Sequence, residues 1–245
     1  MRDLLSRGVL PDGRLRPIDT ACSTEFGVLP HGWTHGSLLD VAETNRQPIL
    51  TGPFGADLGN DDFVPEGIPL LRIGNVRSGS LDLGDLLYVT QEKAIQLARY
   101  AIKAGDLLFT RQGTTGRSAI ATSSVEGALI NYHIIRVALD HEKCSPLFVE
   151  AALGSETVAK QVRREKGRGT RDGINTAQLK ALRVPLAPLA EQRAIARLLI
   201  AWDDQNSQLW EHEAKLRRLK AALMQDLLTG RVRVPLGGAR KEGHA

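Results

Sequence analysis

The sequence has few cysteines and no long apolar run, which disulfide-rich, cysteine-zinc and membrane-spanning proteins need. Its 245 residues include only two cysteines, Cys22 and Cys144, without a CxxC spacing, so neither a disulfide framework nor a cysteine zinc site is supported. No stretch approaches the roughly 18 to 20 consecutive apolar residues of a membrane span, and the first residues lack the apolar run of a signal peptide. With 42% hydrophobic residues, the chain can bury a substantial core. We expect a folded protein of the cytoplasm without membrane association.

The motifs of common catalytic and cofactor sites are also missing. The sequence contains no GxxxxGK[ST], HExxH or GxSxG motif, no glycine-rich strand-to-helix turn of the dinucleotide or S-adenosylmethionine type, and no Asn-Pro-Pro-aromatic motif. His31 and His35 are four apart, but Gly32 and Gly36 argue against a helix that would align them on a metal. The acidic stretch 59–66 lacks the spaced acid pair and lysine of a nuclease. We therefore expect no catalytic residue, no metal site and no cofactor.

Positive charge is present and unevenly distributed. The formal net charge is +4 and the pI is about 9.2, which is compatible with nucleic-acid binding without requiring it. Residues 163–173 concentrate five basic side chains among three glycines, and the glycines let the backbone approach a partner closely. A basic, glycine-rich loop is often only a solvated loop, so this pattern alone leaves both interpretations open.

The element that the sequence predicts most clearly is a long helix near the C-terminal end. Pro185 and Pro188 precede it, Glu191 suits the positive end of its dipole, and Gly230 supplies a stop. The residues between lack proline and glycine, and at about 1.5 Å per residue they would extend for roughly 60 Å, more than a compact domain of this size needs. We predict a projecting coiled-coil helix over residues 188–230.

Apolar residues recur at intervals of seven along this helix, with companions three or four positions further on. Polar residues near the middle of this heptad pattern, Asn206 and His212, would weaken the pairing of helices but fix its register and partner. The alternative is a helix that lies on its own domain, which would usually carry a wider apolar face. The predicted pairing seam comprises Ile195, Leu199, Trp202, Asn206, Leu209, Leu216, Leu219, Leu223 and Leu227.

Residues 30–187 predict one mixed α/β domain with a β-rich core. Apolar segments bounded by turn residues indicate strands, which fall within 67–76, 86–89, 106–122, 127–139 and 183–186. Capping residues and prolines indicate helices, which are predicted over 91–105 after Thr90, over 146–162 after Ser145, and over 177–182 after Asn175 or Thr176. The predicted fold class is α+β, with the long helix following the domain.

The chain begins and nearly finishes with similar residues. MRDLLSRG, at 1–8, and MQDLLTG, at 224–230, share a methionine, an aspartate, two leucines and a hydroxyl residue. A match this short can arise by chance, so it gains meaning only together with other segments.

Several segments together resemble the specificity (S) subunits of type I restriction-modification systems. GINTAQLKALRVPLAPLAEQRAIARLL, residues 173–199, is similar to the junction between a target-recognition domain and a helical conserved region, and MQDLLTGRVRV to the end of that region. LPHGW, GPFGADL, GIPLLRIGNV and GDLLFTRQGTTGRSAIA agree with the recognition domain itself. The resemblance covers nearly the whole chain.

This resemblance implies a non-catalytic subunit that reads one half of a bipartite double-stranded DNA site. Its helices would dock methyltransferase (M) subunits, and the complex with the restriction (R) subunit would have adenine-specific methyltransferase and endonuclease activity. The usual S subunit has two recognition domains and two antiparallel helical regions, whereas this sequence has one of each. We therefore expect a half-sized or truncated S subunit that forms a homodimer or pairs with a second S half.

The resemblance also implies a division of the chain. Residues 1–29 look like the end of a preceding helical region with a linker, and 30–187 like the recognition domain. Residues 188–230 form the spacer, pairing and docking helix, and 231–245 form a flexible basic tail.

DNA would be held through phosphates by lysine and arginine, and read at base edges by polar side chains on loops. Three sets of candidates are predicted. The first lies on and beside the glycine-rich turn 113–116, the second on the basic loop 163–173, and the third, a weaker set, at the end of the strand within 67–76. They are Arg111, Gln112, Thr114, Thr115 and Arg117; Lys166, Arg168, Thr170 and Arg171; and Asn75 and Arg77. Recognition domains vary with the sequence they read, so no base is assigned to a residue.

Two other interpretations stay open. The chain could be a specificity domain detached from a single-chain enzyme that fuses nuclease, methyltransferase and recognition parts. It could also be a stand-alone coiled-coil DNA-binding regulator.

Overall fold

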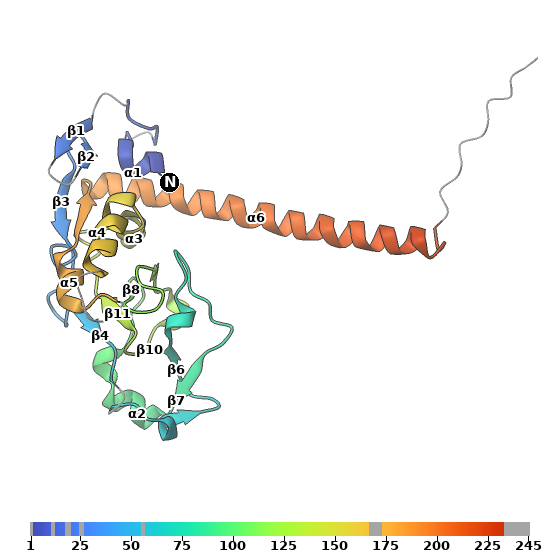
Figure 1. The fold of residues 1–245 in the computed structure, drawn as a ribbon, viewed down its shortest axis with the longest axis horizontal. Coiled ribbons are helices and arrows are strands. Elements are labelled where there is room, and N and C mark those ends of the chain that lie inside the picture. Colours follow the sequence, from blue (N-terminus) through green and yellow to red (C-terminus); the bar gives the residue numbers. More distant parts are fainter. Residues whose placement is uncertain are drawn as a thin grey trace, which may run out of the picture. The chain divides into compact units, whose positions relative to one another are not determined.

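The computed structural model describes residues 2–10, 13–17, 21–24, 27–54, 57–166 and 173–232 (Figure 1). The chain divides into two units, Met1–Leu199 and Ile200–Ala245. The first unit combines four small sheets with short helices, which confirms the predicted α+β class. Within the described ranges, no helix is both long and apolar enough to cross a membrane.

A four-stranded antiparallel sheet carries the most deeply buried strands, in the order β4-β11-β8-β9. Its members are β4 (Ile49–Thr51), β8 (Leu107–Thr110), β9 (Ser118–Ile120) and β11 (Ile134–Val137). Leu107 and Phe109 enter one hydrophobic core and Leu108 enters a second, as the two-residue period of a strand requires. This sheet therefore lies between two cores, and that position explains why every residue of β8 and β11 is buried, without alternation.

A second four-stranded sheet has the order β10-β6-β7-β5, with β10 parallel to β6 and the other pairs antiparallel. Its strands are β5 (Phe63–Val64), β6 (Ile68–Leu71), β7 (Leu87–Val89) and β10 (Leu129–Ile130). Two further sheets have two strands each, and they pair β1 (Ala21–Thr24) with β2 (Gly27–Pro30) and β3 (Thr34–Ser37) with β12 (Arg183–Leu186). The last pair joins the beginning of the predicted domain to its end.

The first predicted helix is shorter than expected. Thr90 caps α2 (Gln91–Gln96) as predicted, because its hydroxyl accepts a hydrogen bond from the Lys93 backbone N–H at 3.2 Å. The helix was expected to continue to residue 105. Instead, a 3-10 turn follows, and the backbone N–H of buried Ile102 donates to the carbonyl of Ala128 at 2.8 Å. Pairing with a distant segment thus replaces the last turns of the helix.

Two other predicted elements are each divided. The apolar run 127–139 forms β10 and β11, which belong to different sheets and are separated by residues 131–133. The second predicted helix is broken at Gly154 and Ser155 into α3 (Pro146–Leu153) and α4 (Glu156–Lys166), where glycine is a poor helix former. Apolar content along the sequence cannot show which sheet a strand joins, so the first division was not predictable.

The short helix α5 (Thr176–Ala181) shows which of two candidate caps is used. The Asn175 side chain accepts from the Gln178 backbone N–H at 2.8 Å, and the Gln178 side chain accepts from the Asn175 N–H at 3.0 Å. This reciprocal arrangement satisfies two otherwise orphaned donors. Asn175 is therefore the cap, and it fixes where the chain turns into the helix.

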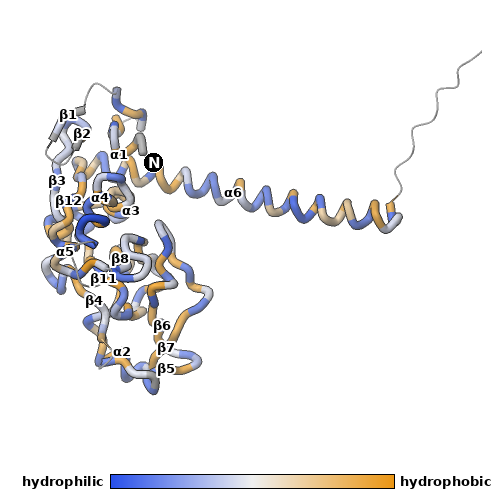
Figure 2. The backbone as a smooth tube through the Cα atoms, viewed as in Figure 1, coloured by the Kyte–Doolittle hydropathy of each residue, from blue (hydrophilic) through white to orange (hydrophobic). Residues whose placement is uncertain are grey.

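The predicted long helix is present as α6 (Leu189–Leu228), with 40 residues. Apolar residues recur along it between polar ones, as Figure 2 shows. From Ile200 onwards, the described side chains of this helix are exposed or half-buried within the chain. Several of the exposed side chains are large and apolar, including Trp202, Leu209, Leu216 and Leu223.

The first turns of α6 belong to the first unit. Ile195 is 0% exposed and Leu199 is 7% exposed, and both lie in a core cluster with Trp33 and Phe148. The prediction that Ile195 and Leu199 pair with another helix is therefore wrong, because the chain's own domain covers them. A heptad pattern gives the buried face of a helix but not the molecule that buries it.

The N-terminal segment is attached to the same part of α6. After α1 (Arg2–Arg7), the Val9 N–H donates to Glu191 Oε1 at 2.8 Å, and Arg16 forms an ion pair with Glu191 Oε2 at 2.7 Å. Gly8 has a φ of +73°, and a Cβ on it would lie 2.5 Å from Glu191 Oε1. Another residue at position 8 would be strained by this φ and would displace the Glu191 carboxylate, so the attachment of the N-terminal segment favours glycine there.

Candidate nucleic-acid interface

The candidate interface centres on the turn between β8 and β9. Gly113 and Gly116 have φ values of +71° and +98°, which glycine adopts without strain. Thr110, at the buried end of β8, donates its hydroxyl to the Thr114 carbonyl at 2.6 Å and accepts the Arg117 N–H at 3.1 Å. The turn is thus held in one conformation by a threonine that the sequence did not single out.

The hydroxyls of the two predicted threonines are turned inward. Thr115 donates to the Arg111 carbonyl at 3.2 Å, and Oγ1 of Thr114 is buried from solvent. The Thr115 hydroxyl thus serves the turn itself, whereas the Thr114 hydroxyl is buried without a hydrogen-bond partner among the described residues, so neither is presented to DNA as the turn stands. Arg111, Gln112 and Arg117 therefore remain as its candidates for DNA contact, and all three are half-buried.

The turn is joined to the end of the basic loop. Gly173 pairs with Gln112 through the backbone, and the Ile174 N–H donates to the Arg111 carbonyl at 2.7 Å. A Cβ on Gly173 would lie 2.5 Å from that carbonyl oxygen, so a glycine is needed where the two segments meet. The turn therefore adjoins the described residues at which the basic loop ends, Gly173 and Ile174.

The beginning of the basic loop also lies near the turn. Val162, in the last turns of α4, lies 3.4 Å from the position that a Cβ on Gly116 would occupy. Lys166 is the last residue of α4 and is half-buried. Three predicted contacts lie outside the described residues, namely Arg168, Thr170 and Arg171.

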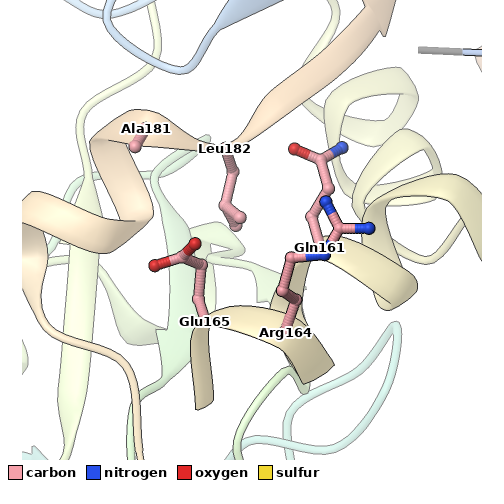
Figure 3. A pocket seen from close by; sticks show the side chains of 5 residues that line it. All are labelled: Gln161, Arg164, Glu165, Ala181 and Leu182. Carbon is pink, nitrogen blue, oxygen red and sulfur yellow. The ribbon is translucent and has the colours of Figure 1, made fainter. Parts of the chain in front are cut away.

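Glutamine side chains anchor both ends of this loop. Gln161 donates to the Arg183 carbonyl at 2.8 Å and accepts its N–H at 3.0 Å, and Gln178 donates to the Glu165 carbonyl at 3.0 Å. These bonds border a pocket between α4 and the end of α5, lined by Gln161, Arg164, Glu165, Ala181 and Leu182 (Figure 3). Because the Gln161 amide is engaged on both sides, we interpret this pocket as part of the anchor of the loop.

The segment 73–79, which contains the third predicted set, also lies close to the turn and to the start of β9. The Gly79 N–H donates to the Ser118 carbonyl at 2.8 Å. Ile73 Cδ1 lies 3.6 Å from the position of a Cβ on Gly113. The described ends of the basic loop and the segment 73–79 therefore both adjoin the β8–β9 region, although they are far apart in the sequence.

Within that third set, Asn75 is a structural residue. It is 4% exposed, and its side chain accepts from the Arg72 N–H at 2.8 Å and donates to the carbonyls of Asp82 and Asp85 at 2.8 and 2.9 Å. The prediction that Asn75 contacts DNA is therefore wrong, because its donors and acceptor hold two segments together. Arg77 forms an ion pair with Asp82 at 2.9 Å and holds the pKa of that carboxyl below its ordinary value.

Sequence reasoning missed two aromatic residues at this place. Phe54 and Tyr132 have ring centroids 6.2 Å apart, and the Arg111 guanidinium carbon lies 6.0 Å from the Phe54 ring. Burial, and then the charge of Arg111, lower the pKa of His133, whose ring lies against that of Tyr132. Neither aromatic lies in a periodic segment, so only their exposure in the fold distinguishes them.

The buried charges elsewhere in the first unit are structural. Asp106 is 1% exposed, accepts the Lys103 N–H at 2.8 Å and pairs with Arg46, while Arg136 donates to two backbone carbonyls. A buried carboxylate satisfied in this way is expected in a core. Among the described residues, no group of three or more His, Cys, Asp and Glu side chains is placed to hold a metal ion.

Comparison with protein families gives a match over residues 30–217 to the family described as type I restriction modification DNA specificity domain. The chain belongs to this family. The match includes the whole candidate interface and most of α6.

Two curated relatives carry the same description in their names. The chain is 27% identical over 212 residues to the putative type I restriction enzyme MjaX specificity subunit of Methanocaldococcus jannaschii, with 84% of this chain and 48% of that one covered. It is 26% identical over 170 residues to the type I restriction enzyme EcoBI specificity subunit of Escherichia coli, with 69% and 35% covered. The chain thus spans about half, or less, of the length of the curated relatives it matches.

Solved structures show the same fold. The HsdS subunit from Thermoanaerobacter tengcongensis is similar with a TM-score of 0.58 and 18% identity, over 87% of this chain and 52% of that one. A chain from a study of complex assembly and conformational transition of the type I R-M system has a TM-score of 0.56 and 19% identity, over 81% and 46%.

Proposed function

We propose that this chain is a DNA-specificity subunit that reads one half of a bipartite target. The observation that carries the proposal is that the basic β8–β9 turn adjoins two other segments, the described ends of the basic loop and residues 73–79, in a domain of this family. Phosphates are held by basic side chains near the turn, and base edges are read by the side chains on it. The residues assigned to this contact are Arg111, Gln112, Arg117, Lys166, Arg168, Thr170 and Arg171, with Arg77 at the margin.

In this proposal the chain is not an enzyme. It directs methyltransferase and restriction subunits to the site, and the long helix provides their docking surface. The adenine methylation and DNA cleavage belong to the assembled complex.

The exposed part of α6 is proposed to pair with a second copy or with another S half. Its apolar side chains Trp202, Leu209, Leu216 and Leu223 are each at least half exposed within the chain. An antiparallel pair can place Trp202 opposite Leu223 and Leu209 opposite Leu216, so that both helices use the same residues. Such a pair has a two-fold axis and would supply the second recognition domain.

The charge distribution along α6 favours the antiparallel direction. Residues 203–213 contain four carboxylates and no lysine or arginine, whereas residues 215–220 contain four basic side chains and no carboxylate. Antiparallel pairing places the acidic segment of each helix beside the basic segment of the other. Parallel pairing would place like charges together, and charges at the edges of a seam decide orientation in coiled coils.

Reconstitution tests the function. The chain is combined with a cognate methyltransferase subunit, and methylated adenines are mapped on genomic DNA. We expect methylation confined to one split sequence, and none without the chain. Methylation that is absent, or independent of this chain, would contradict the proposal, and sequence-specific DNA binding without any methyltransferase partner would favour a regulator.

The mass in solution tests the pairing. We expect a dimer that the double substitution Leu209→Asp and Leu216→Asp converts to a monomer, because two buried charges per helix would lack partners. The matched control is Ala214→Asp with Ala221→Asp, which adds the same charge to exposed positions away from the seam. Light scattering that shows equal masses for the two variants would refute this seam.

A further inference from the structure

Aromatic side chains are few in this sequence, 4% of the residues, and most of those in the first unit are covered. Among its described residues only Phe54 and Tyr132 are exposed, at 59% and 39%. The others are buried or half-buried, namely Trp33, Phe63, Tyr88, Tyr100, Phe109 and Phe148. Since burial of an aromatic ring is favourable by a few kcal/mol, two exposed rings in contact indicate a use other than stability.

The backbone holds these two rings in place. Phe54 follows β4, and Tyr132 lies between β10 and β11. The Gly52 N–H donates to the Ile134 carbonyl at 3.2 Å, and a Cβ on Gly52 would lie 2.3 Å from the Asn131 carbonyl oxygen. The two segments therefore cross at a glycine, and the exposed pair is a fixed feature of the fold rather than the tip of a loose loop.

The same segments contact the first residue of the candidate turn. The Arg111 N–H donates to the His133 carbonyl at 3.0 Å, and its guanidinium approaches the Tyr132 carbonyl at 3.5 Å and the face of Phe54. The apolar pair and the predicted base-reading arginine thus form one surface. Arginine binds the acceptor edge of guanine in the major groove, and the group beside it that an aromatic ring can recognise is the 5-methyl group of thymine.

We propose that Phe54 and Tyr132 form an apolar contact for the methyl group of one thymine in the half-site, and so determine specificity at that base pair. The inference rests on the proposed DNA-reading function. It assigns to this surface a ligand that the basic residues alone would not select.

The geometry favours this contact over insertion of a ring between base pairs. An inserted wedge unstacks a base step and needs both faces of a protruding side chain. The Tyr132 ring already lies against His133, with ring centroids 3.8 Å apart, and Phe54 has Tyr132 and Arg111 as neighbours. Neither ring therefore stands clear of other side chains, but the exposed fractions of Phe54 and Tyr132, 59% and 39%, leave room for contact with a methyl group.

The test begins after methylation mapping has defined the half-site. Each thymine of that half-site is replaced singly by deoxyuridine, which removes only the methyl group, and affinity is measured by fluorescence anisotropy. For the unaltered protein we expect one position at which deoxyuridine weakens binding about fourfold, as for the loss of one buried methyl group. Phe54→Ala should bind more weakly and no longer distinguish thymine from deoxyuridine there.

Two variants serve as controls. Tyr132→Phe keeps the ring and should keep the discrimination. Ile95→Ala removes an apolar side chain that is 66% exposed on α2 and should leave both affinity and discrimination unchanged.

The inference is overturned if no thymine is sensitive, if the half-site contains none, or if Phe54→Ala retains the thymine preference. An equal loss of affinity by Phe54→Ala on both kinds of duplex would indicate stacking and would also overturn it. Failure of the proposed function itself appears earlier, as the absence of sequence-specific methylation.

Discussion

Arg117 ends the β8–β9 turn, and no described residue pairs with its guanidinium group. Its main chain is fixed by the Thr110 hydroxyl at 3.1 Å, so the side chain starts from a rigid support. Such an arginine suits a phosphate contact, because the cost of ordering its backbone has been met by folding.

We predict that Arg117→Ala weakens binding to all DNA sequences by a similar factor. The slope of log affinity against log salt concentration should fall by about one, as expected for one lost phosphate contact. Lys103→Ala is the control, since this exposed lysine precedes the opposite end of β8. An unchanged salt slope for Arg117→Ala would remove this residue from the backbone contact, and a loss at one base pair only would assign it to base reading.

The two cysteines should differ in reactivity. Burial raises the pKa of Cys144 to about 12, whereas Cys22 is exposed. Because the thiolate is the reactive form, we predict that one thiol per chain reacts with an aromatic disulfide reagent at pH 8 in the folded protein, and two react after denaturation. Rapid reaction of both thiols in the folded state would show that the core around Cys144 opens.

At the scale of elements, the attachment of the N-terminal segment to α6 depends on one carboxylate. Glu191 is 8% exposed, accepts the Val9 N–H and pairs with Arg16. We predict that Glu191→Ala lowers the free energy of unfolding by about 1–3 kcal/mol, because it leaves a buried N–H without an acceptor.

Urea denaturation measures this loss, and Glu213→Ala provides the comparison. Glu213 pairs with Arg217 at 2.6 Å on the exposed part of α6, where an i,i+4 pair contributes only a few tenths of a kcal/mol. Equal effects of the two substitutions would mean that the Glu191 contacts are not formed in solution.

The direction of α6 pairing is also testable at this scale. In the antiparallel arrangement proposed above, Gln205 of one helix faces Lys220 of the other. With Cys22 replaced by serine, we predict that a mixture of Gln205→Cys and Lys220→Cys proteins forms a disulfide-linked dimer on mild oxidation, while neither protein alone does. Self-linked dimers of each single variant would instead indicate parallel helices.

At the scale of the whole molecule, the chain has one recognition domain and spans about half of its curated relatives. We predict that a duplex with two inverted half-sites at the natural spacing binds more tightly than a duplex with one, because the second contact becomes intramolecular. The Leu209→Asp and Leu216→Asp variant should bind both duplexes alike. If the intact protein also shows no preference, the two domains do not engage one site together.

The sequence by itself determined the elements that depend on local rules. Thr90 and Asn175 cap helices through their own neighbours, Gly113 and Gly116 permit the turn, and the absence of proline and glycine permits a helix of 40 residues. These features rest on contacts within a few residues, and the family match agrees with the segments that carried the resemblance.

The tertiary structure decided what depends on distant segments. Ile195 and Leu199 lie in the chain's own core. The Asn75 side chain hydrogen-bonds a neighbouring loop. Phe54 and Tyr132 lie beside Arg111. None of these outcomes could be predicted from sequence alone, because burial of an apolar or polar residue depends on which remote segment covers it. The sequence indicated which residues suit the proposed DNA-reading surface, and only the fold showed that Asn75 and Thr115 have side chains engaged within the chain.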